Sequence, residues 1–457
     1  MRINLSKSLI NFAKTLPVSL YAVGGVVRNF LIDGSVSRDV DLAAALPAQD
    51  FLRALENTDF TLCAEYKRTG TVMFTDGKFK YEFTAFRKEE YSAGGGHTPI
   101  KTEFTSDIKE DALRRDFKCN AVYYDIVNEQ IIDPLGGVND IRDKVIDTVT
   151  DPEKVFVSDG LRLMRLARFT GELNFKPTYS VINSAKKYAD NINDISPERI
   201  YSELKLILVA DTKYPFSDKM GHYNALKILD QTRVLDRIFP ELTDGRNMAQ
   251  RADFHKYDVL EHGLRSAAYA HPTIRLAALL HDIGKPFCFR RDGYYYHHFS
   301  EGVPIAEKVL KRFKADSSTI EQVKYLVKEH MVDLDCSMSE GKVRKFIVKN
   351  HPRLQELLMI KQADFRASLE VEYTAPTLVK WERLYKKMLV DGTPFDLKGL
   401  KITATELMEM GFKGKLLGKE LNKLWDFAIV HPSKNVYEVL KERAKKDQIQ
   451  ITVDKNS

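Results

Sequence analysis

The chain has 457 residues, and its 70 lysines and arginines against 64 aspartates and glutamates leave a net charge of +6. This mild basic excess permits a nucleic-acid partner without establishing one, and the absence of any run of about 18 apolar residues argues against a membrane-spanning helix. Four scattered cysteines without metal-type spacing, and no secretion signal, predict reduced thiols in a cytoplasmic protein with no membrane partner.

The first part of the chain, to about residue 150, mixes apolar runs of strand type with short helical segments. The strand-type runs lie at 20–25, 39–45, 70–74, 80–86, 120–125 and 129–134. From about Val155 the apolar spacing becomes helical, at 160–173, 179–192 and 197–209, and nearly everything after that is predicted to be helical. We therefore predict an α+β protein, with a small α/β head containing a mixed sheet, followed by an all-α neck, body and tail.

A glycine turn and a pair of aspartates in the head have the composition of a nucleotide site. Gly24 and Gly25 stand between a strand-like run and a helix, where close backbone approach and free N–H groups favour phosphate. Asp39 and Asp41 alternate with apolar residues, so on a strand both carboxylates face the same way. Paired carboxylates beside a triphosphate, with Arg28 nearby, suggest Mg²⁺. On the pair alone, two ordinary surface acids at a strand end remain an equal alternative.

Several segments together resemble the class II tRNA nucleotidyltransferase and bacterial poly(A) polymerase family over nearly the whole chain. They are GGVVRNFLIDGSVSRDVDLAAA at 24–45, LRRDFKCNAVYYD at 113–125, IIDPLGGVNDIRDKVI at 131–146, SDGLRLMRLARF at 158–169, ISPERIYSELKLIL at 195–208 and LMEMGFKGKLLGKELNKLW at 407–425. The resemblance implies that Asp39 and Asp41 are catalytic Mg²⁺ ligands. It also implies a nucleotide-binding set made of Gly24, Gly25, Arg28, Arg114, Arg115, Asp116, Asn120, Asp159, Arg162, Arg165 and Arg168.

The chemistry of Asp159 and Arg162 suits recognition of a base. The two residues are three apart, so on a helix they would share a face. Asp159 can accept from the exocyclic amine of cytosine or adenine, while Arg162 donates to the adjacent ring nitrogen. Uracil and guanine present a carbonyl to the carboxylate and would be refused. The resemblance implies that this pair is the protein template for CTP and ATP, whereas without the surrounding motifs an exposed helical salt bridge is the favoured interpretation.

The helical body carries a second set of candidate ligands. RLAALLHDIGKP at 275–286 places His281 and Asp282 at the end of an apolar helix, and this pattern resembles the HD phosphohydrolase superfamily. The resemblance implies further ligands at His262, His298, His330 and Asp364. Such a set could hold one or two divalent ions, of which Ni²⁺, Mn²⁺, Co²⁺ and Zn²⁺ suit imidazole. An isolated buried histidine is more often a hydrogen-bonded core residue, and some members of the family keep this domain only as structure.

These resemblances imply a CCA-adding enzyme that transfers CMP twice, and then AMP, from CTP and ATP to the 3′ end of tRNA. We expect a nucleotidyltransferase head at 1–150, a neck with the base-reading motif at 151–235, an HD-like metal domain at 236–390 and a tRNA-binding tail at 391–457. Poly(A), CC-only and A-only addition are alternatives within the class. A metal-dependent phosphohydrolase acting on nucleotides or RNA ends, and an impaired RNA-binding paralog, are alternatives from other classes. The oligomeric state stays open between a monomer and a homodimer.

Several positions depart from the pattern of the family. Asn29 stands where Asp is usual, Ser158 stands where Glu is usual, and Gly96 replaces an Arg in a glycine-rich loop that begins at Ser92. Lys118 and Cys119 replace the usual Thr and Ile. The catalytic aspartates and the base-reading pair are retained, so we expect activity, while the departures bear on base selectivity and on the switch from C to A.

Overall fold

The computed structural model describes residues 2–67, 70–91, 96 and 99–456 and divides the chain into two compact units. The first unit comprises Met1–Asp244 with Lys308–Ser317, and the second comprises Gly245–Glu307 with Ser318–Ser457. Within the described part of the chain, no helix is long and apolar enough to cross a membrane. The four cysteines are free thiols, as their scattered spacing predicts.

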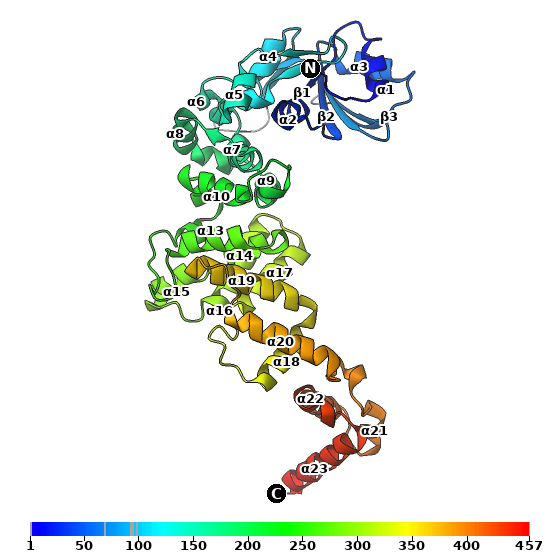
Figure 1. Cartoon of the computed structure of the whole chain (residues 1–457), viewed down its shortest axis with the longest axis vertical. Coiled ribbons are helices and arrows are strands. Elements are labelled where there is room, and N and C mark those ends of the chain that lie inside the picture. The colour runs from blue at the N-terminus through cyan, green and yellow to red at the C-terminus, as the bar shows by residue number, and fades with distance from the viewer. Residues whose placement is uncertain (1, 68–69, 92–95, 97–98, 457) are drawn as a thin grey trace. The chain divides into compact units, whose positions relative to one another are not determined.

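A seven-stranded mixed sheet forms the centre of the head in the first unit (Figure 1). Its strands are β1 (Tyr21–Val23), β2 (Asp39–Ala44), β3 (Thr61–Tyr66), β4 (Thr71–Thr75), β5 (Lys80–Ala85), β8 (Tyr123–Asp125) and β9 (Gln130–Ile132). They lie in the order β3–β4–β5–β2–β1–β8–β9, with β2 and β5 parallel and the other neighbours antiparallel. Two-stranded pairs join β6 (Arg87–Glu90) to β7 (Lys101–Phe104) and β10 (Val145–Ile146) to β11 (Lys176–Pro177). The predicted α+β head with a mixed sheet is confirmed.

The local structure around β2 places the aspartate pair beside the glycine turn. Val40 is 1% exposed in the core, while its neighbours Asp39 and Asp41 face outward, because successive side chains on a strand alternate between faces. Strand β1 leads into helix α2 (Gly25–Asp33) through Gly24, whose φ of 75° is favourable for glycine. A Cβ atom on Gly24 would lie 2.9 Å from Asp41 Oδ2, so the turn and the carboxylate are in close contact.

Helices complete the first unit. Those of the head are α1 (Lys7–Ala13), α3 (Ala48–Leu55), α4 (Ile108–Leu113) and α5 (Gly137–Asp143). Those that follow are α6 (Pro152–Ser158), α7 (Leu161–Leu173), α8 (Tyr179–Lys187), α9 (Pro197–Ile207), α10 (Gly221–Gln231), α11 (Val234–Ile238) and α12 (Pro240–Thr243). Helix α7 is buried along most of its length against α9 and α10, so the segment predicted to read the base lies on a firmly packed element.

Among the described residues of the second unit, helices are the regular elements. Its helices are α13 (Val259–Tyr269), α14 (Arg275–Leu280), α15 (Lys285–Asp292), α17 (Ser317–Glu329), α18 (Glu340–Asn350), α19 (Leu354–Leu369), α20 (Pro376–Val390), α21 (Ala404–Glu409), α22 (Lys415–Val430) and α23 (Tyr437–Asn456). Helix α16 (His298–Arg312) begins in this unit and ends in the first. The last helices pack around their own apolar cluster, which includes Leu424 and Leu440.

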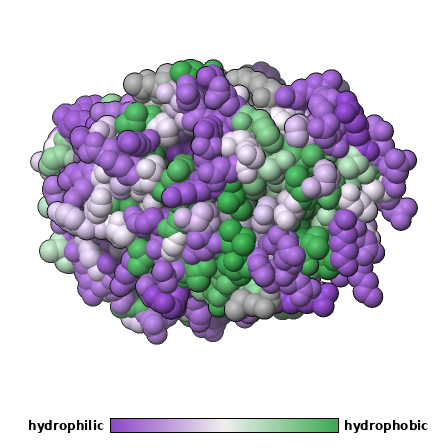
Figure 2. Space-filling view, turned by 90° about the horizontal axis from the view of Figure 1, so that it is seen from above, coloured by the Kyte–Doolittle hydropathy of each residue, from purple (hydrophilic) through white to green (hydrophobic). Residues whose placement is uncertain are grey.

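The structure also contains strands that the sequence pattern does not predict. Nearly all residues of β3 are exposed at the edge of the sheet, and β6 consists of the charged residues RKEE, so neither shows the apolar alternation that signals a strand. The glycine-rich loop predicted from Ser92 lies largely outside the described residues. On the face seen in Figure 2, hydrophilic residues predominate around the margin and hydrophobic residues gather toward the middle.

Candidate active site and candidate metal centre

One cavity in the first unit is lined by all the residues that the sequence predicts for nucleotide transfer. Its volume is about 1250 Å³. The predicted residues in its lining are Gly24, Gly25, Arg28, Asp39, Asp41, Arg114, Arg115, Asp116, Asn120, Asp159, Arg162, Arg165 and Arg168. The lining also includes residues that the sequence analysis missed, namely Phe169, Arg199, Glu203, Lys213 and Tyr214. The head and the neck therefore both contribute residues to one cavity.

The aspartate pair opens on this cavity with the electrostatics of a cation site. Desolvation raises the pKa of Asp41, while nearby arginines, Arg115 first, act in the opposite direction. Asp41 is paired in register with Glu82 of β5, and the pKa of Glu82 is raised by desolvation and then by Asp41. The sequence analysis missed Glu82, although an acid within the strand-type run at 80–86 was an available signal. Two neighbouring carboxylates repel each other when both are ionised, and a bound divalent cation offsets that repulsion. The carboxylate oxygens of this group therefore fit Mg²⁺.

Arg28 is buried at the cavity wall and is held by neutral partners. Its Nε and Nη2 atoms donate to Asn29 Oδ1 at 3.1 and 2.9 Å. Its Nη1 donates to Asn120 Oδ1 at 2.5 Å, and its Nη2 donates to the Tyr214 hydroxyl at 3.1 Å. The Asn29 amide carries no charge, so the carboxylates that act on Arg28 electrostatically are those of Asp41 and Glu172. A phosphate group in the cavity would add a further negative partner.

The carboxylate of Asp111 holds both arginines of the LRRD segment in place. Asp111 Oδ1 accepts from Arg114 Nε at 2.7 Å, and Asp111 Oδ2 accepts from Arg115 Nη2 at 3.1 Å. Desolvation opposes ionisation of Asp111, but the two arginines outweigh it and lower the pKa of Asp111 to about 2. Asp116 accepts from Arg165 in the same way, and the pKa of Asp116 is also lowered to about 2. The guanidinium groups are therefore positioned at the cavity wall by the fold itself.

The base-reading pair adopts a geometry that the spacing does not predict. Asp159 lies just before α7 in extended backbone, not on a shared helix face, and its Oδ1 accepts from the Leu161 N–H at 2.9 Å. Aspartate favours such capping positions because its short side chain reaches the free N–H groups of a first turn. Arg162 Nη1 donates to Ser158 Oγ at 3.0 Å, and Arg162 Nη2 donates to the Arg114 carbonyl at 2.6 Å. Ser158 thus anchors Arg162 through a neutral hydroxyl.

Arg168 is held from two sides by acids of the neck. Its Nε lies 2.8 Å from Glu203 Oε2, and its Nη1 lies 3.6 Å from Glu172 Oε1. Glu172 is buried, and desolvation raises its pKa. The spacing of Arg168 and Glu172, four residues apart on one helix, was a signal for this pair that the sequence analysis did not use.

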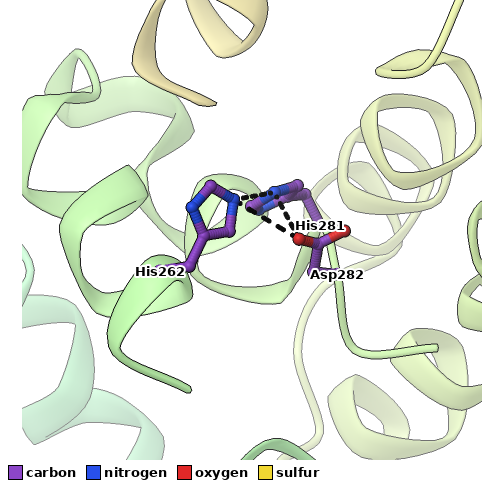
Figure 3. A group of neighbouring side chains, drawn as sticks. All are labelled: His262, His281 and Asp282. Carbon is purple, nitrogen blue, oxygen red and sulfur yellow. Dashed lines mark hydrogen bonds and ion pairs between the residues drawn. The ribbon is translucent and has the colours of Figure 1, made fainter. Parts of the chain in front are cut away.

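A second cluster of ligand-type side chains lies in the second unit. His262 on α13 faces His281 and Asp282 at the end of α14 (Figure 3), and its Nε2 is 3.2 Å from His281 Nε2 and 3.4 Å from Asp282 Oδ2. The other oxygen of Asp282, Oδ1, is 3.1 Å from His298 Nε2 and 3.7 Å from His330 Nε2. These residues are buried and form two overlapping groups that share Asp282. The end of α14 is therefore the centre of the cluster, as the sequence predicts.

The remaining predicted ligand and the ring orientations complete the fit to a metal ion. Asp364 Oδ1 lies 3.0 Å from His262 Nε2, so every predicted HD residue joins the cluster. The Nδ1 atoms of three histidines donate to backbone carbonyls, in the pairs His281 to Ala278, His298 to Tyr295 and His330 to Val327, at 2.7, 2.8 and 2.8 Å. This arrangement turns each Nε2 toward the carboxylates, which is how histidine is usually oriented for a metal.

Close packing and further polar residues support the cluster. A Cβ atom on Gly284 would lie 2.1 Å from the His298 carbonyl oxygen, so only glycine lets α16 approach the HD pair this closely. Lys285 Nζ lies 2.7 Å from Asp282 Oδ2 and donates to Gln250 Oε1 at 2.6 Å. The sequence analysis missed Lys285, although it directly follows the quoted HDIG pattern. The donor set of imidazole nitrogens and carboxylates fits one or two transition-metal ions.

Three family models match successive parts of the chain. They describe the poly A polymerase head domain at residues 20–147, the probable RNA and SrmB-binding site of polymerase A at 174–245, and the HD domain at 259–365. Nucleotidyltransferase and HD domains of these kinds imply a dependence on divalent metal ions. The head model covers the aspartate pair and the LRRD segment of the cavity, and the HD model covers the histidine cluster, whereas the cavity residues Asp159 and Arg162 lie between the matched segments.

Characterised relatives point in the same direction. The A-adding tRNA nucleotidyltransferase of Deinococcus radiodurans is 28% identical over 373 residues, which is 77% of each chain. The CCA-adding enzyme of Anoxybacillus flavithermus is 32% identical over 239 residues, and this match spans 51% of the present chain and 55% of that enzyme. The multifunctional CCA protein of Xanthomonas campestris is 26% identical over 432 residues, covering 88% of this chain and 96% of that protein.

Solved structures share the fold. The CCA-adding enzyme of Bacillus stearothermophilus in complex with CTP has a TM-score of 0.66 at 21% identity and covers 97% of this chain and 98% of that one. The Thermotoga maritima CCA-adding enzyme complexed with tRNA has a TM-score of 0.58 at 18% identity and covers 95% of this chain and 93% of that one. With its cavity, its histidine cluster and these matches, the chain belongs to the family of tRNA nucleotidyltransferases and bacterial poly(A) polymerases that carry an HD domain.

Proposed function

We propose that this protein adds CCA to the 3′ end of tRNA from CTP and ATP, without a nucleic-acid template. The observation that carries the proposal is the single cavity that unites the aspartate pair, the glycine turn and the base-reading pair. Relatives named CCA-adding enzyme, and the shared fold with structures holding CTP or tRNA, support it. The terminal ribose hydroxyl of tRNA attacks the α-phosphorus in line, and pyrophosphate leaves without a covalent enzyme intermediate.

The head supplies the groups that handle phosphate. Gly24 and the helix that follows it place backbone N–H groups and Arg28 toward the triphosphate. Asp39 and Asp41 would hold Mg²⁺, which when bound activates the hydroxyl and stabilises the leaving pyrophosphate. Arg115, fixed by its bond to Asp111, adds positive charge beside the aspartate pair.

The neck supplies the groups that select the base. Asp159 accepts from the exocyclic amine shared by cytosine and adenine, and Arg162 donates to the neighbouring ring nitrogen. Asp159 and Arg162 are 5% and 7% exposed, so a mismatched base leaves a polar group without a partner in a site that water barely reaches. This cost disfavours UTP and GTP.

We assign the helical body and tail to tRNA binding through backbone and shape, as RNA duplexes are generally bound. We keep the predicted domain limits as part of the proposal, with the head at 1–150, the neck at 151–235, the HD-like domain at 236–390 and the tail at 391–457. Free cysteines and a role in tRNA maturation fit a cytoplasmic site of action.

Incubation of the purified protein with tRNA that lacks its end, offering each labelled nucleotide in turn, tests the proposal. Two C additions followed by one A are expected. Addition of A alone, of C alone or of a long A tail would replace CCA addition by the corresponding alternative. Asp39→Ala and Asp41→Ala should lose nearly all incorporation while tRNA binding survives, and Glu56→Gln, an exposed acid of the head, is the control. Activity of either aspartate variant within about tenfold of wild type would contradict the metal assignment.

A second activity, metal-dependent hydrolysis of phosphate esters, is favoured by the histidine cluster. Its specific support is the convergence of four Nε2 atoms on the two carboxylates of Asp282 and Asp364. Imidazole-rich sets favour Ni²⁺, Mn²⁺, Co²⁺ or Zn²⁺ over Mg²⁺. Elemental analysis of the purified protein and hydrolysis of bis(p-nitrophenyl) phosphate test this proposal. A protein that binds none of these metals and cleaves no ester would reduce the domain to a structural element.

A further inference from the structure

The surface beside the histidine cluster carries an unusual group of exposed aromatic rings. We call this group the aromatic rim, and it consists of Phe254, Phe287, Phe289, Tyr294 and Tyr296, which are 53%, 38%, 43%, 65% and 76% exposed. Single exposed apolar residues are common on proteins and need no explanation. A group of large rings within two short segments, all in the second unit, is different, because each ring forgoes the burial that would stabilise the fold.

Ring and arginine contacts connect parts of the aromatic rim. The centroids of Tyr294 and Tyr296 are 6.0 Å apart. Arg251 lies over the ring of Phe254 at 4.6 Å and is close enough to Tyr296 to interact with it electrostatically, so the segment that holds Phe254 adjoins the tyrosines. The half-buried Tyr295 stacks on Phe289 with centroids 5.4 Å apart. These contacts bring Phe254, through Arg251, and Phe289, through Tyr295, next to the segment that holds Tyr294 and Tyr296.

Tyr295 also connects the aromatic rim to the candidate metal centre. Its ring lies 5.9 Å from Lys285 Nζ, which is itself 2.7 Å from Asp282 Oδ2. Its backbone carbonyl accepts from His298 Nδ1 at 2.8 Å, and its hydroxyl donates to the Ala249 carbonyl at 2.5 Å. The same residue thus orients a metal-ligand histidine and braces the loop that precedes Phe254. Tyr295 and Lys285 thus form a chain of contacts from Phe289 in the rim to Asp282 in the cluster.

The residues of the rim indicate which class of partner it can bind. Arg251 and Arg291 each lie over a ring of the rim, and each is also paired with an acid, at Asp253 and Asp292 respectively. Net charge therefore contributes little to binding of a partner by the rim. The exposed ring faces contribute most. Nucleobases stack on such faces with little dependence on sequence, provided that they are unpaired. A phosphate ester bound at the adjacent cluster would bring its own bases to this surface.

We propose that the aromatic rim binds the unpaired nucleotides of a single-stranded RNA end whose phosphate reaches the histidine cluster. The proposal rests on the second proposed activity for the chemistry at the cluster, but it concerns binding by the rim. Several successive rings fit several successive bases, which favours an RNA strand over a mononucleotide. The rim is far in sequence from the nucleotide-transfer cavity and shares no residue with it.

The test uses the full-length protein and a fluorescein-labelled oligoribonucleotide that ends in a 2′,3′-cyclic phosphate. Fluorescence anisotropy at fixed salt measures its binding, and 4-thiouridine crosslinking followed by peptide mapping locates it. The variant Tyr294→Ala/Tyr296→Ala should weaken binding about tenfold or more, because it removes two stacking faces. Tyr179→Ala removes a tyrosine that is 83% exposed on the first unit and should leave binding unchanged.

The readouts separate the rim from the metal centre. Hydrolysis of bis(p-nitrophenyl) phosphate, which has no base, should be equal in the wild type and the rim variant, and crosslinks should map to the segment that contains α15 and the tyrosines. Equal RNA affinity in both proteins, crosslinks confined to the first unit, or binding of a mononucleotide as tight as that of the oligonucleotide would each overturn the proposal. If the wild type does not hydrolyse bis(p-nitrophenyl) phosphate, only the second proposed activity is refuted. RNA binding measured by anisotropy does not depend on ester hydrolysis.

Discussion

Arg165 on α7 and Asp116 in the LRRD segment form a two-pronged ion pair, with Arg165 Nε and Nη2 at 2.8 and 2.6 Å from Asp116 Oδ2. A second bond, from Arg162 Nη2 to the Arg114 carbonyl, joins the same two elements. Helix α7, which carries Arg162, is thereby tied to the LRRD segment in the wall of the same cavity. Under the proposed function, this pair joins the groups assigned to the phosphates with the groups assigned to the base.

Removal of one partner of this pair should destabilise the protein. In Arg165→Met the carboxylate of Asp116, which is 5% exposed, loses the partner that keeps it ionised. We expect the free energy of unfolding to fall by about 2–3 kcal/mol, measured by urea denaturation, because an unpaired buried charge is costly. The double variant Arg165→Met/Asp116→Asn should recover part of that loss. Arg142→Met, which breaks an exposed pair with Asp143, should leave the free energy of unfolding nearly unchanged. Additive losses in the double variant would show that the pair is not coupled.

Base selectivity should depend on the carboxylate of Asp159. Asp159→Ala removes the acceptor that favours an amine and repels a carbonyl, so incorporation of UTP and GTP relative to CTP and ATP should rise about tenfold or more. Single-turnover incorporation with each nucleotide measures the ratio. Glu153→Gln, on the neighbouring α6 and outside the cavity lining, serves as the matched control. A variant that is slower with all four nucleotides, and equally selective, would assign Asp159 to helix capping alone.

The two metal centres should act independently. Their ligands come from different compact units, so His281→Ala/Asp282→Ala should remove bound transition metal and ester hydrolysis while CTP and ATP incorporation persists. Metal content, both activities and the melting temperature are followed together, because an emptied site can unfold its own module. His271→Ala, an exposed histidine of the same unit, controls for the substitution itself. A double variant that stays folded but no longer adds nucleotides would show coupling between the centres.

The tail should lose stability as the pH rises toward neutrality. Glu420 on α22 is 4% exposed, and burial, followed by repulsion from Asp447, raises its pKa from 4.5 to about 7. The folded state then holds a proton that the unfolded state has already released, so stability is full below about pH 4.5 and falls until about pH 7. Lys423, which pairs with Asp447 at 2.7 Å, and Arg443 oppose the shift without cancelling it.

Replacement of Glu420 tests this pH dependence. Glu420→Gln should raise the melting temperature relative to wild type at pH 8, because the neutral amide needs no proton, and should change it little at pH 4.5. Glu409→Gln, an exposed acid of the same tail, should have no such effect. Thermal unfolding by circular dichroism at both pH values makes the comparison. A shift of equal size at the two pH values would place the effect in packing instead of ionisation.

Local patterns were sufficient for much of the fold and for the candidate pair at Asp39 and Asp41, whereas most other candidate site residues came from the resemblance to a known family. The alternation in DVDLAA predicts that Asp39 and Asp41 share a face, since side chains on a strand alternate regardless of what surrounds them. The glycine turn before α2 and the apolar helix that ends at His281 are likewise properties of short segments. Such patterns can be recognised because their physics involves residues within a few positions of one another.

Other features were decided by contacts between distant segments. Glu82 lies beside Asp41 because β2 and β5 pair in parallel register, and Tyr214 reaches Arg28 across 186 positions of the chain. Asp159 caps α7 instead of sharing its face with Arg162, because the fold begins that helix after it. No spacing in the sequence encodes these relationships, since they depend on which surfaces pack together. The chain's motifs specify which residues can do the chemistry, and tertiary packing decides which partners hold them in position.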